Sequence, residues 1–181
     1  MIHSFDYPEL AELALPAARA YARIAPSAPH AQHMPSHIFT RLGMWKESID
    51  SNITSAQTAQ RWISKTHAGA TAFDALHAMD YLEYAYLQTG QDAKAREVAD
   101  NVAKVTSFDI AQFAAGYALA AVPARHALER RAWSEAAAVT ASRRRSHGRS
   151  IPMPRRSFIS RAQLGRRGRA TRTRRGRTSR R

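Results

Sequence analysis

Residues 82–102 have the sequence LEYAYLQTGQDAKAREVADNV, and this stretch contains the pattern from which the fold follows. Leu82 and Tyr86 share one face of a helix, and apolar residues recur at the same spacing after residue 94. Gly90 lies between the two segments, where a residue in the left-handed region commonly ends a helix. The stretch therefore predicts two antiparallel helices joined by a two-residue turn at 90–91.

Two more copies of this pattern lie on either side of it. Residues 38–56, IFTRLGMWKESIDSNITSA, have Gly43 at the turn, and residues 128–137, LERRAWSEAA, have Arg131 in place of the glycine. In each copy an aromatic residue or Asp stands two positions after the turn residue. A small residue stands five positions after it, so that the paired helices can approach closely. The positions expected to pack the repeats are Phe39, Gly43, Trp45, Ser48, Leu82, Ala85, Tyr86, Gly90, Ala95, Trp133 and Ala136.

This arrangement resembles the tetratricopeptide repeat family, and the string HMPSHIF at 33–39 is similar to bacterial members of unassigned role. The resemblance covers about residues 8–140 and implies an all-α fold, in which antiparallel helix–turn–helix units stack as a solenoid. The three turns lie 47 and then 41 residues apart, whereas the usual repeat has about 34 residues. Longer helices, or an inserted segment such as 62–71, are expected to account for the difference.

Charge divides the chain into two parts at residue 142. Residues 142–181 contain 16 arginines and no lysine or acidic residue, whereas residues 1–141 hold the other 12 basic residues and all 14 acidic ones. The net charge of +14 is therefore a property of the tail, and the body has a net charge of −2. We expect a helical repeat domain over 1–141, with turns near 43–44, 90–91 and 131–132, and a disordered Arg-rich tail over 142–181.

The composition of the tail is consistent with several origins. A native basic tail would bind nucleic acid by neutralising phosphates, so nucleic acid is a partner only if the tail is native. Arginine without lysine also results when GC-rich coding sequence is translated in a wrong frame. Codons permitted for residues 142–171, shifted by two nucleotides, can encode another amphipathic helix. A frameshift product is therefore the preferred interpretation, and another kind of linker is the third.

The region before the first turn is predicted to form two helices. Asp6 is expected to cap the first, with Glu9 reaching back to it, and Pro16 is expected to break or kink that helix. Ser27 is expected to cap the second, which Pro35 interrupts. Because no polar capping unit precedes this region, the array is expected to be truncated at its start and to self-associate through uncapped ends.

Histidines and other polar residues fall on one predicted surface. In the tetratricopeptide family the first helix of each unit lines a concave groove, and its groove positions are counted back from the turn glycine. Here those positions are His30, His33, His37, Thr40, Arg41, His77, Asp80, Tyr84, Leu87 and Gln88. The resemblance thus implies a groove for a protein or peptide, in which imidazoles and Tyr84 form hydrogen bonds and Arg41 binds a carboxylate.

Two other interpretations of the histidines stay open. His33, His37 and His77 could hold zinc or another divalent ion together with Asp80, since imidazole and carboxylate are common metal ligands. The histidines could instead satisfy helix ends or face solvent. The HxxHxxxH spacing lacks the Glu of a metalloprotease helix, so hydrolase chemistry is not expected.

Composition and the lack of other motifs exclude several classes of protein. Without cysteine the chain has no disulfide and no thiolate nucleophile. No apolar run approaches about 18 residues and no secretory signal is visible, so we expect a cytoplasmic protein without a membrane partner. No phosphate-binding loop or nucleophile elbow occurs, and Asn52-Ile53-Thr54 matches a glycosylation sequon by chance. We therefore expect a non-catalytic protein without a cofactor.

Overall fold

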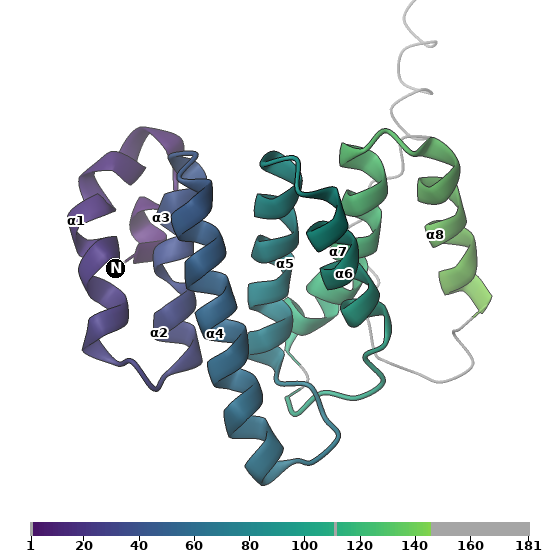
Figure 1. Cartoon of the computed structure of the whole chain (residues 1–181), viewed down its shortest axis with the longest axis horizontal. Coiled ribbons are helices and arrows are strands. Elements are labelled where there is room, and N and C mark those ends of the chain that lie inside the picture. Colours follow the sequence, from purple (N-terminus) through teal and green to yellow (C-terminus); the bar gives the residue numbers. More distant parts are fainter. Residues whose placement is uncertain (1, 111, 146–181) are drawn as a thin grey trace, which may run out of the picture. The chain divides into compact units, whose positions relative to one another are not determined.

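The computed structural model describes residues 2–110 and 112–145, and it is built from helices (Figure 1). Apart from one isolated bridge between Thr71 and Phe108, no strand pairing occurs in these ranges. The predicted all-α class is confirmed for the described residues. The elements are a 3-10 helix, Ile2–Phe5, followed by α1 Pro8–Ile24, α2 Pro29–His33, α3 Pro35–Arg41, α4 Trp45–Thr66, α5 Phe73–Gln88, α6 Asp92–Ala103, α7 Phe113–Glu129 and α8 Trp133–Arg145.

Three helix pairs, α3–α4, α5–α6 and α7–α8, are joined by the same turn. Gly43 and Gly90 both have φ of +67°, and Arg131 has φ of +56°. In each turn the backbone amide of the next residue donates to the carbonyl five positions before it. The three bonds are Met44 to Phe39 at 2.8 Å, Gln91 to Tyr86 at 2.9 Å and Ala132 to Ala127 at 2.8 Å. This is the Schellman arrangement, which satisfies carbonyls at a helix end. The position that Arg131 shares with the two glycines therefore has the same backbone geometry.

Arg131 is strained by this geometry, because a Cβ atom disfavours the left-handed region. Replacing Arg131 with glycine should raise the free energy of unfolding by about 1 kcal/mol, measured by urea denaturation. The matched change is Gly90→Ala, where an added Cβ meets nothing within 4 Å, so only backbone strain is introduced. We expect it to lower stability by about 1 kcal/mol. Destabilisation by Arg131→Gly would contradict the shared geometry.

The helices bury two main apolar clusters. One joins α1, α3 and the 3-10 helix, and consists of Ile2, Ala11, Ala14, Ala18, Met34, Ile38 and Phe39. The other lies among α4, α5, α6 and α7, and consists of Ile49, Leu76, Leu82, Ala85, Tyr86, Ala95, Val98, Ala99, Val102, Ala115, Ala118 and Val122. Phe39, Leu82, Ala85, Tyr86 and Ala95, all expected to pack the repeats, belong to these clusters.

The remaining packing positions differ between the three turns. Ser48 is fully buried, Trp45 is partly buried against the second cluster, and Ala136 is half-buried. Trp133 was expected to pack, yet 64% of its surface is exposed, and Trp62 is exposed to 53%. Within the described part of the chain α8 packs mainly on α7, so little surrounds the Trp133 indole.

Only some of the helix boundaries predicted before the first turn are confirmed. The expected cap at Asp6 is wrong, because α1 begins at Pro8 and Tyr7 holds the N-cap position without a side-chain hydrogen bond. Of the break or kink expected at Pro16, the break is wrong, since α1 continues past this residue. Pro35 does separate α2 from α3, as its missing amide predicts. The cap residue of α2 is Ala28 instead of Ser27.

Two boundaries bear on the domain prediction. The long spacing between the first two turns is taken up by α4, which extends to Thr66, and by the loop that follows it. At the other end, α8 continues to Arg145, four residues past the predicted limit of the body at 141. The rest of the predicted tail, 146–181, lies outside the described residues. Among the described helices, none is both long and apolar enough to cross a membrane.

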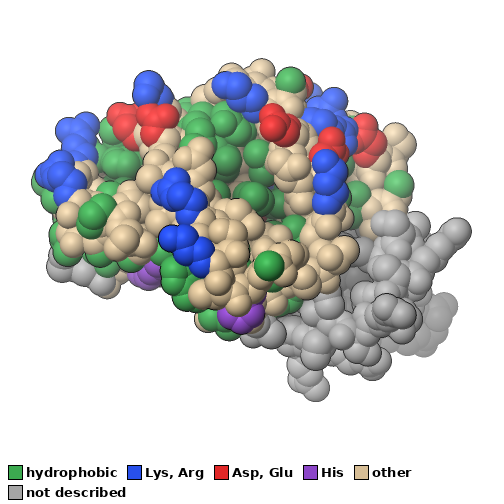
Figure 2. Space-filling view, turned by 60° about the horizontal axis from the view of Figure 1, so that its bottom comes forward, with side chains coloured by type: hydrophobic (Ala, Val, Ile, Leu, Met, Phe, Trp, Pro, Cys, Tyr) green, Lys and Arg blue, Asp and Glu red, His purple; other side chains and the backbone are tan. Residues whose placement is uncertain are grey.

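Acidic and basic side chains both occur on the face of the body drawn in Figure 2. Acidic side chains lie beside basic ones along its upper part, whereas other basic side chains stand apart from them. Ion pairs between side chains of the body include Lys46 with Asp50 at 2.6 Å and Arg96 with Glu135 at 3.2 Å. Such a surface is consistent with a body of net charge −2.

Candidate functional site

Three histidines meet where α2 and α3 lie against α5. His33 and His37 are buried and His77 is half-buried. The centroid of the His33 ring lies 4.4 Å from that of His77 and 4.8 Å from that of His37. Met34, between the two short helices, keeps right-handed helical angles (φ −49°, ψ −39°). Residues 33 and 37 therefore remain on one helical face although Pro35 interrupts the hydrogen bonding.

Buried acceptors determine which nitrogens of two of these rings carry a proton. The Nδ2 amide of Asn52 donates to the Ser48 carbonyl at 2.8 Å, so its Oδ1 is the acceptor that lies 2.7 Å from His33 Nδ1. His37 Nδ1 lies 2.9 Å from a carboxylate oxygen of Asp6. Because amide and carboxylate oxygens only accept, both Nδ1 atoms must donate. Both Nε2 atoms are then unprotonated whenever the rings are neutral.

The two Nε2 atoms face one another at 3.0 Å. Burial lowers the pKa of His33 well below its usual value, and the neighbouring imidazole of His77 lowers it further. Burial also lowers the pKa of His37 to about 4, although its bond to Asp6 opposes this shift. At neutral pH the two rings therefore direct lone pairs at each other. The pKa of His77 is likewise lowered by burial, and its buried Nδ1 has no hydrogen-bond partner among the described residues.

A cavity of about 560 Å³ opens beside this cluster. His37 and His77 reach it directly, whereas His33 lies behind the wall. Charged and aromatic side chains from α3, α5 and α7 form most of the remaining surface. The lining residues are Asp6, His37, Thr40, Arg41, His77, Asp80, Tyr81, Tyr84, Phe113, Ala114, Tyr117 and Arg125.

Each arginine of the cavity is held by an acidic partner. Arg41 donates through Nε to Asp6 at 2.7 Å, which raises the pKa of Arg41. Its side chain is still 44% exposed, and its terminal nitrogens make no hydrogen bond to the described residues. Arg125 donates to Asp80 at 2.6 Å and lies over the ring of Tyr84, 5.4 Å from the centroid. Arg41 is thus held in place by Asp6 and can still form hydrogen bonds to a ligand. Arg125 instead interacts mainly with Asp80 and Tyr84 of the cavity wall.

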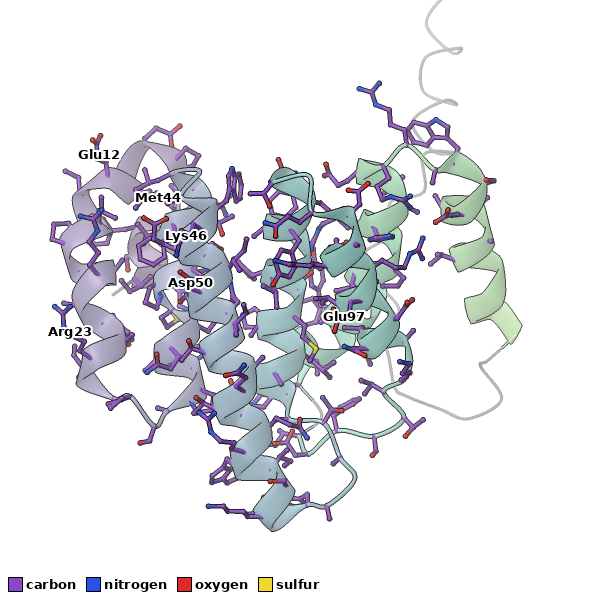
Figure 3. All side chains as sticks on the ribbon, in the orientation of Figure 1. Glu12, Arg23, Met44, Lys46, Asp50 and Glu97 are labelled. Atoms are coloured by element: carbon purple, nitrogen blue, oxygen red, sulfur yellow. The ribbon has the colours of Figure 1, made fainter. Side chains whose placement is uncertain are left out.

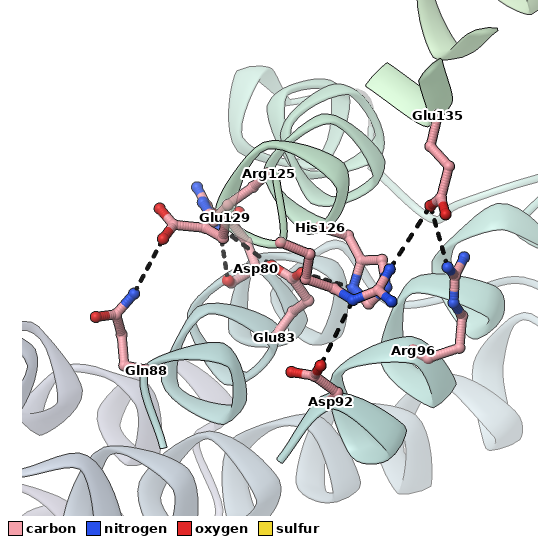
Figure 4. A network of polar contacts seen from close by, with 10 residues as sticks. Asp80, Glu83, Gln88, Asp92, Arg96, Arg125, His126, Glu129 and Glu135 are labelled. Carbon is pink, nitrogen blue, oxygen red and sulfur yellow. Dashed lines mark hydrogen bonds and ion pairs between the residues drawn. The ribbon is translucent and has the colours of Figure 1, made fainter. Parts of the chain in front are cut away.

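Arg125 also belongs to a network of polar contacts that includes Glu83 and His126 (Figure 4). Glu83 is fully buried, 3.8 Å from Arg125 and 3.3 Å from His126. Burial raises the pKa of Glu83 to about 8, although the charge of Arg125 opposes the shift. Glu83 therefore holds a proton at neutral pH, and the carboxyl group that accepts the hydrogen bond from Arg125 is that of Asp80.

The structure brings together many of the predicted groove residues. His37, Thr40, Arg41, His77, Asp80 and Tyr84 all line the cavity. His33 lies behind it, and His30 is exposed, 3.9 Å from Asp74. The last two positions lie elsewhere: Leu87 lines a separate small cavity, and Gln88 donates to Glu129 at 3.4 Å. The register of the turn thus locates the middle of the predicted surface better than its ends.

Asp80 does not join the histidines as a ligand set. Its Oδ1 is 2.6 Å from Arg125, and the ring nitrogens that come together belong to His33, His37 and His77. The sequence indicated a quartet because the groove positions implied by the family resemblance place Asp80 on the same surface as the three histidines. The structure separates them because an arginine 45 residues later engages the carboxylate.

Several residues of the site were missed. Asp6 was interpreted as a cap, and Arg125 lay in a helix with no sign of its role. Tyr81, whose hydroxyl is 3.0 Å from His37 Nδ1, follows His77 by four positions and so shares its helical face. Asn52 matches a glycosylation sequon only by chance. Its side chain is completely buried and contacts His33, so a glycan could not be attached to it. Phe113 and Tyr117 carried no local signal.

Comparisons with protein-family models, with curated proteins and with solved structures find no match to this chain.

Proposed function

We propose that this chain is a non-catalytic scaffold of the tetratricopeptide type, which binds a peptide segment in the cavity between α3, α5 and α7. The observation that carries the proposal is Arg41, which lines the cavity, is anchored to Asp6 through Nε, and has terminal nitrogens that make no hydrogen bond to the described residues. The three hairpins with equivalent turns support the repeat assignment. The first helix of each hairpin contributes residues to the lining of the cavity.

The size and the lining of the cavity support this proposal. Its volume falls within the range of about 300–1,000 Å³ that is usual for ligand sites. Tyr84, Phe113 and Tyr117 supply flat apolar surface, and the two terminal nitrogens of Arg41 match the two oxygens of a carboxylate. We therefore expect a ligand that presents a free carboxylate beside an apolar side chain.

Titration of the full chain with fluorescein-labelled random hexapeptides, followed by anisotropy, tests this function. Peptides with a free C-terminal carboxylate should bind more tightly than the same peptides with an amidated C-terminus. Arg41→Gln should weaken binding of the carboxylate form by about ten- to a hundredfold, since a charge-assisted hydrogen bond contributes about 1.5–3 kcal/mol. The amidated form should be little affected by the same change.

Lys46→Gln is the matched control, because Lys46 is a highly exposed cation that does not line the cavity. It should leave both affinities unchanged. Equal binding of carboxylate and amide forms, or equal loss with Lys46→Gln and Arg41→Gln, would overturn the proposal. The alternative function, nucleic-acid binding, rests on a tail of which residues 146–181 lie outside the described part.

A further inference from the structure

We infer that His33, His37 and His77 form a binding site for a divalent transition-metal ion. One ring nitrogen of each histidine can be chosen so that all three lie within 4.8 Å of one another. The inference goes beyond peptide binding and does not depend on it, because it rests on the ring nitrogens alone.

The strongest reason is the contact between His33 and His37. Their Nδ1 protons are directed to Asn52 and Asp6, so the Nε2 atoms, 3.0 Å apart, have no hydrogen between them. Two lone pairs at this distance repel, and a cation between them converts the repulsion into attraction. Zinc bound to two imidazoles at about 2.0–2.1 Å in tetrahedral geometry places the nitrogens about 3.4 Å apart. The observed pair needs to open by only about 0.4 Å.

His77 supplies the third nitrogen from the opposite helix. Its Nδ1 is buried and has no partner among the described residues, which is costly for a polar atom. Coordination would satisfy one of its nitrogens and leave the other free to donate. Since the three nitrogens lie within 4.8 Å of one another, none needs to move closer to another by more than about 1.4 Å to reach the tetrahedral spacing, and side-chain rotation on α5 can supply this.

The hydrogen-bond partners of His33 and His37 are of the kind that commonly support metal-binding histidines. Asp6 accepts from His37 and Asn52 accepts from His33, each at the nitrogen opposite the proposed ligand atom. Such partners orient the imidazole and hold the correct tautomer. Imidazole binds a metal in its neutral form, and the hydrogen bonds to Asn52 and Asp6 leave the lone pairs on the Nε2 atoms of His33 and His37.

The donor set limits the kind of ion. Three imidazoles without thiolate or clustered carboxylates suit zinc, copper, nickel or iron, and do not suit magnesium or calcium. His37 and His77 line the cavity, so the fourth position of a tetrahedral ion would be reached from that side. Three protein ligands with one open position are typical of sites where an ion binds a water or an external ligand.

A second group, formed by His3, Asp6 and His37, shares one histidine with the proposed site. In that group Asp6 and His37 already satisfy each other at 2.9 Å, and His3 is exposed. We therefore assign the ion to His33, His37 and His77, and the variants below separate the two groups.

Calorimetric titration of the chelator-treated full chain with ZnCl₂ at pH 7.5 tests the site. One ion should bind per chain with a Kd of about 1 µM or tighter. His77→Gln and His33→Gln should each weaken binding at least about a hundredfold, and Asp6→Asn by about ten- to a hundredfold. Matched controls are His3→Ala and His67→Ala, which should leave the affinity unchanged. Bound Co²⁺ should give the intense visible absorption of a tetrahedral site, and this absorption should be lost in His77→Gln.

Far-UV circular dichroism of each variant keeps the test interpretable, since His33 is fully buried whereas His77 lies at the cavity wall. Absence of saturable zinc binding by the wild-type chain would overturn the inference. So would retention of full affinity in a folded His77→Gln variant, or loss of affinity in His3→Ala. When the peptide titration is also carried out on chelator-treated protein, failure of one proposal is distinguishable from failure of the other.

Discussion

Replacing Ile38 with alanine should lower the free energy of unfolding by about 3–4 kcal/mol. Ile38 is fully buried on α3, in the cluster that joins α1 to the 3-10 helix. Truncation removes buried methyl groups and leaves a cavity that packed neighbours such as Ala14 and Ala18 are too small to fill. The measurement is urea denaturation of the full chain, followed by circular dichroism.

Ile24→Ala is the matched control, because the same atoms are removed from a side chain that is 77% exposed at the end of α1. It should change stability by no more than about 0.5 kcal/mol. Similar effects of the two substitutions would contradict the packing of α3 described above.

Arg125→Met should lower stability by about 3 kcal/mol at pH 7, because it leaves Asp80 as a buried carboxylate without its cation. The pair is largely enclosed, with 22% of the arginine and 6% of the aspartate side chain exposed. Methionine keeps much of the apolar stem, so most of the loss reports the charge. The matched control is Lys46→Met, which breaks the exposed pair with Asp50 on α4 and should have no measurable effect (Figure 3).

Glu83 gives this prediction a pH dependence with a definite sign. Because burial raises the pKa of Glu83 to about 8, the folded chain binds a proton that the unfolded chain releases near its usual pKa of 4.5. The corresponding stability is fully present below about pH 4.5 and is lost as the pH rises through about 8. Arg125 opposes the raised pKa, so in Arg125→Met the loss should still begin near pH 4.5 but should continue to higher pH than in the wild-type chain.

Urea midpoints at pH 5, 7 and 9 measure the effect. Burial lowers the pKa values of His33 and His37 below 6.5, so these groups make the folded chain more stable as the pH rises to about 6.5 and oppose Glu83 there. The contribution of Glu83 is therefore the difference in stability between the wild-type chain and Glu83→Gln, which cannot ionise, and this difference should fall between pH 5 and 9. The same pH dependence in both chains would show that another group is responsible. A decline that disappears in Arg125→Met would contradict the sign worked out for Glu83.

The helices and turns could be predicted because their signals are local. The spacing of Leu82 and Tyr86, followed by Gly90, describes a helix and its end within a single stretch of chain. Arg131 was placed by alignment with the glycines instead of by residue type, and its φ of +56° agrees with theirs. Asp6 shows the limit of such signals. Its position suits a helix cap, yet two side chains from α3 bind it instead.

The site was predictable only where repeat register determines which face a residue occupies. Counting back from the turns placed His37, Arg41 and His77 at the cavity that the structure contains. The same count could not find Arg125, which donates to Asp80 across 45 residues of sequence. The count also could not predict that Asp80 would pair with Arg125 and therefore not join the three histidines.

By itself the sequence determined that the described chain is helical, where its hairpins turn, and that histidines gather on one face. Periodicity and backbone preference act over a few residues, so they can be inferred without knowing what lies opposite. Only the tertiary structure decided which nitrogens face each other. The bonds of His33 to Asn52 and of His37 to Asp6 join residues 19 and 31 positions apart. Contacts of that range depend on how the helices pack, and they set the protonation and the chemistry of the cluster.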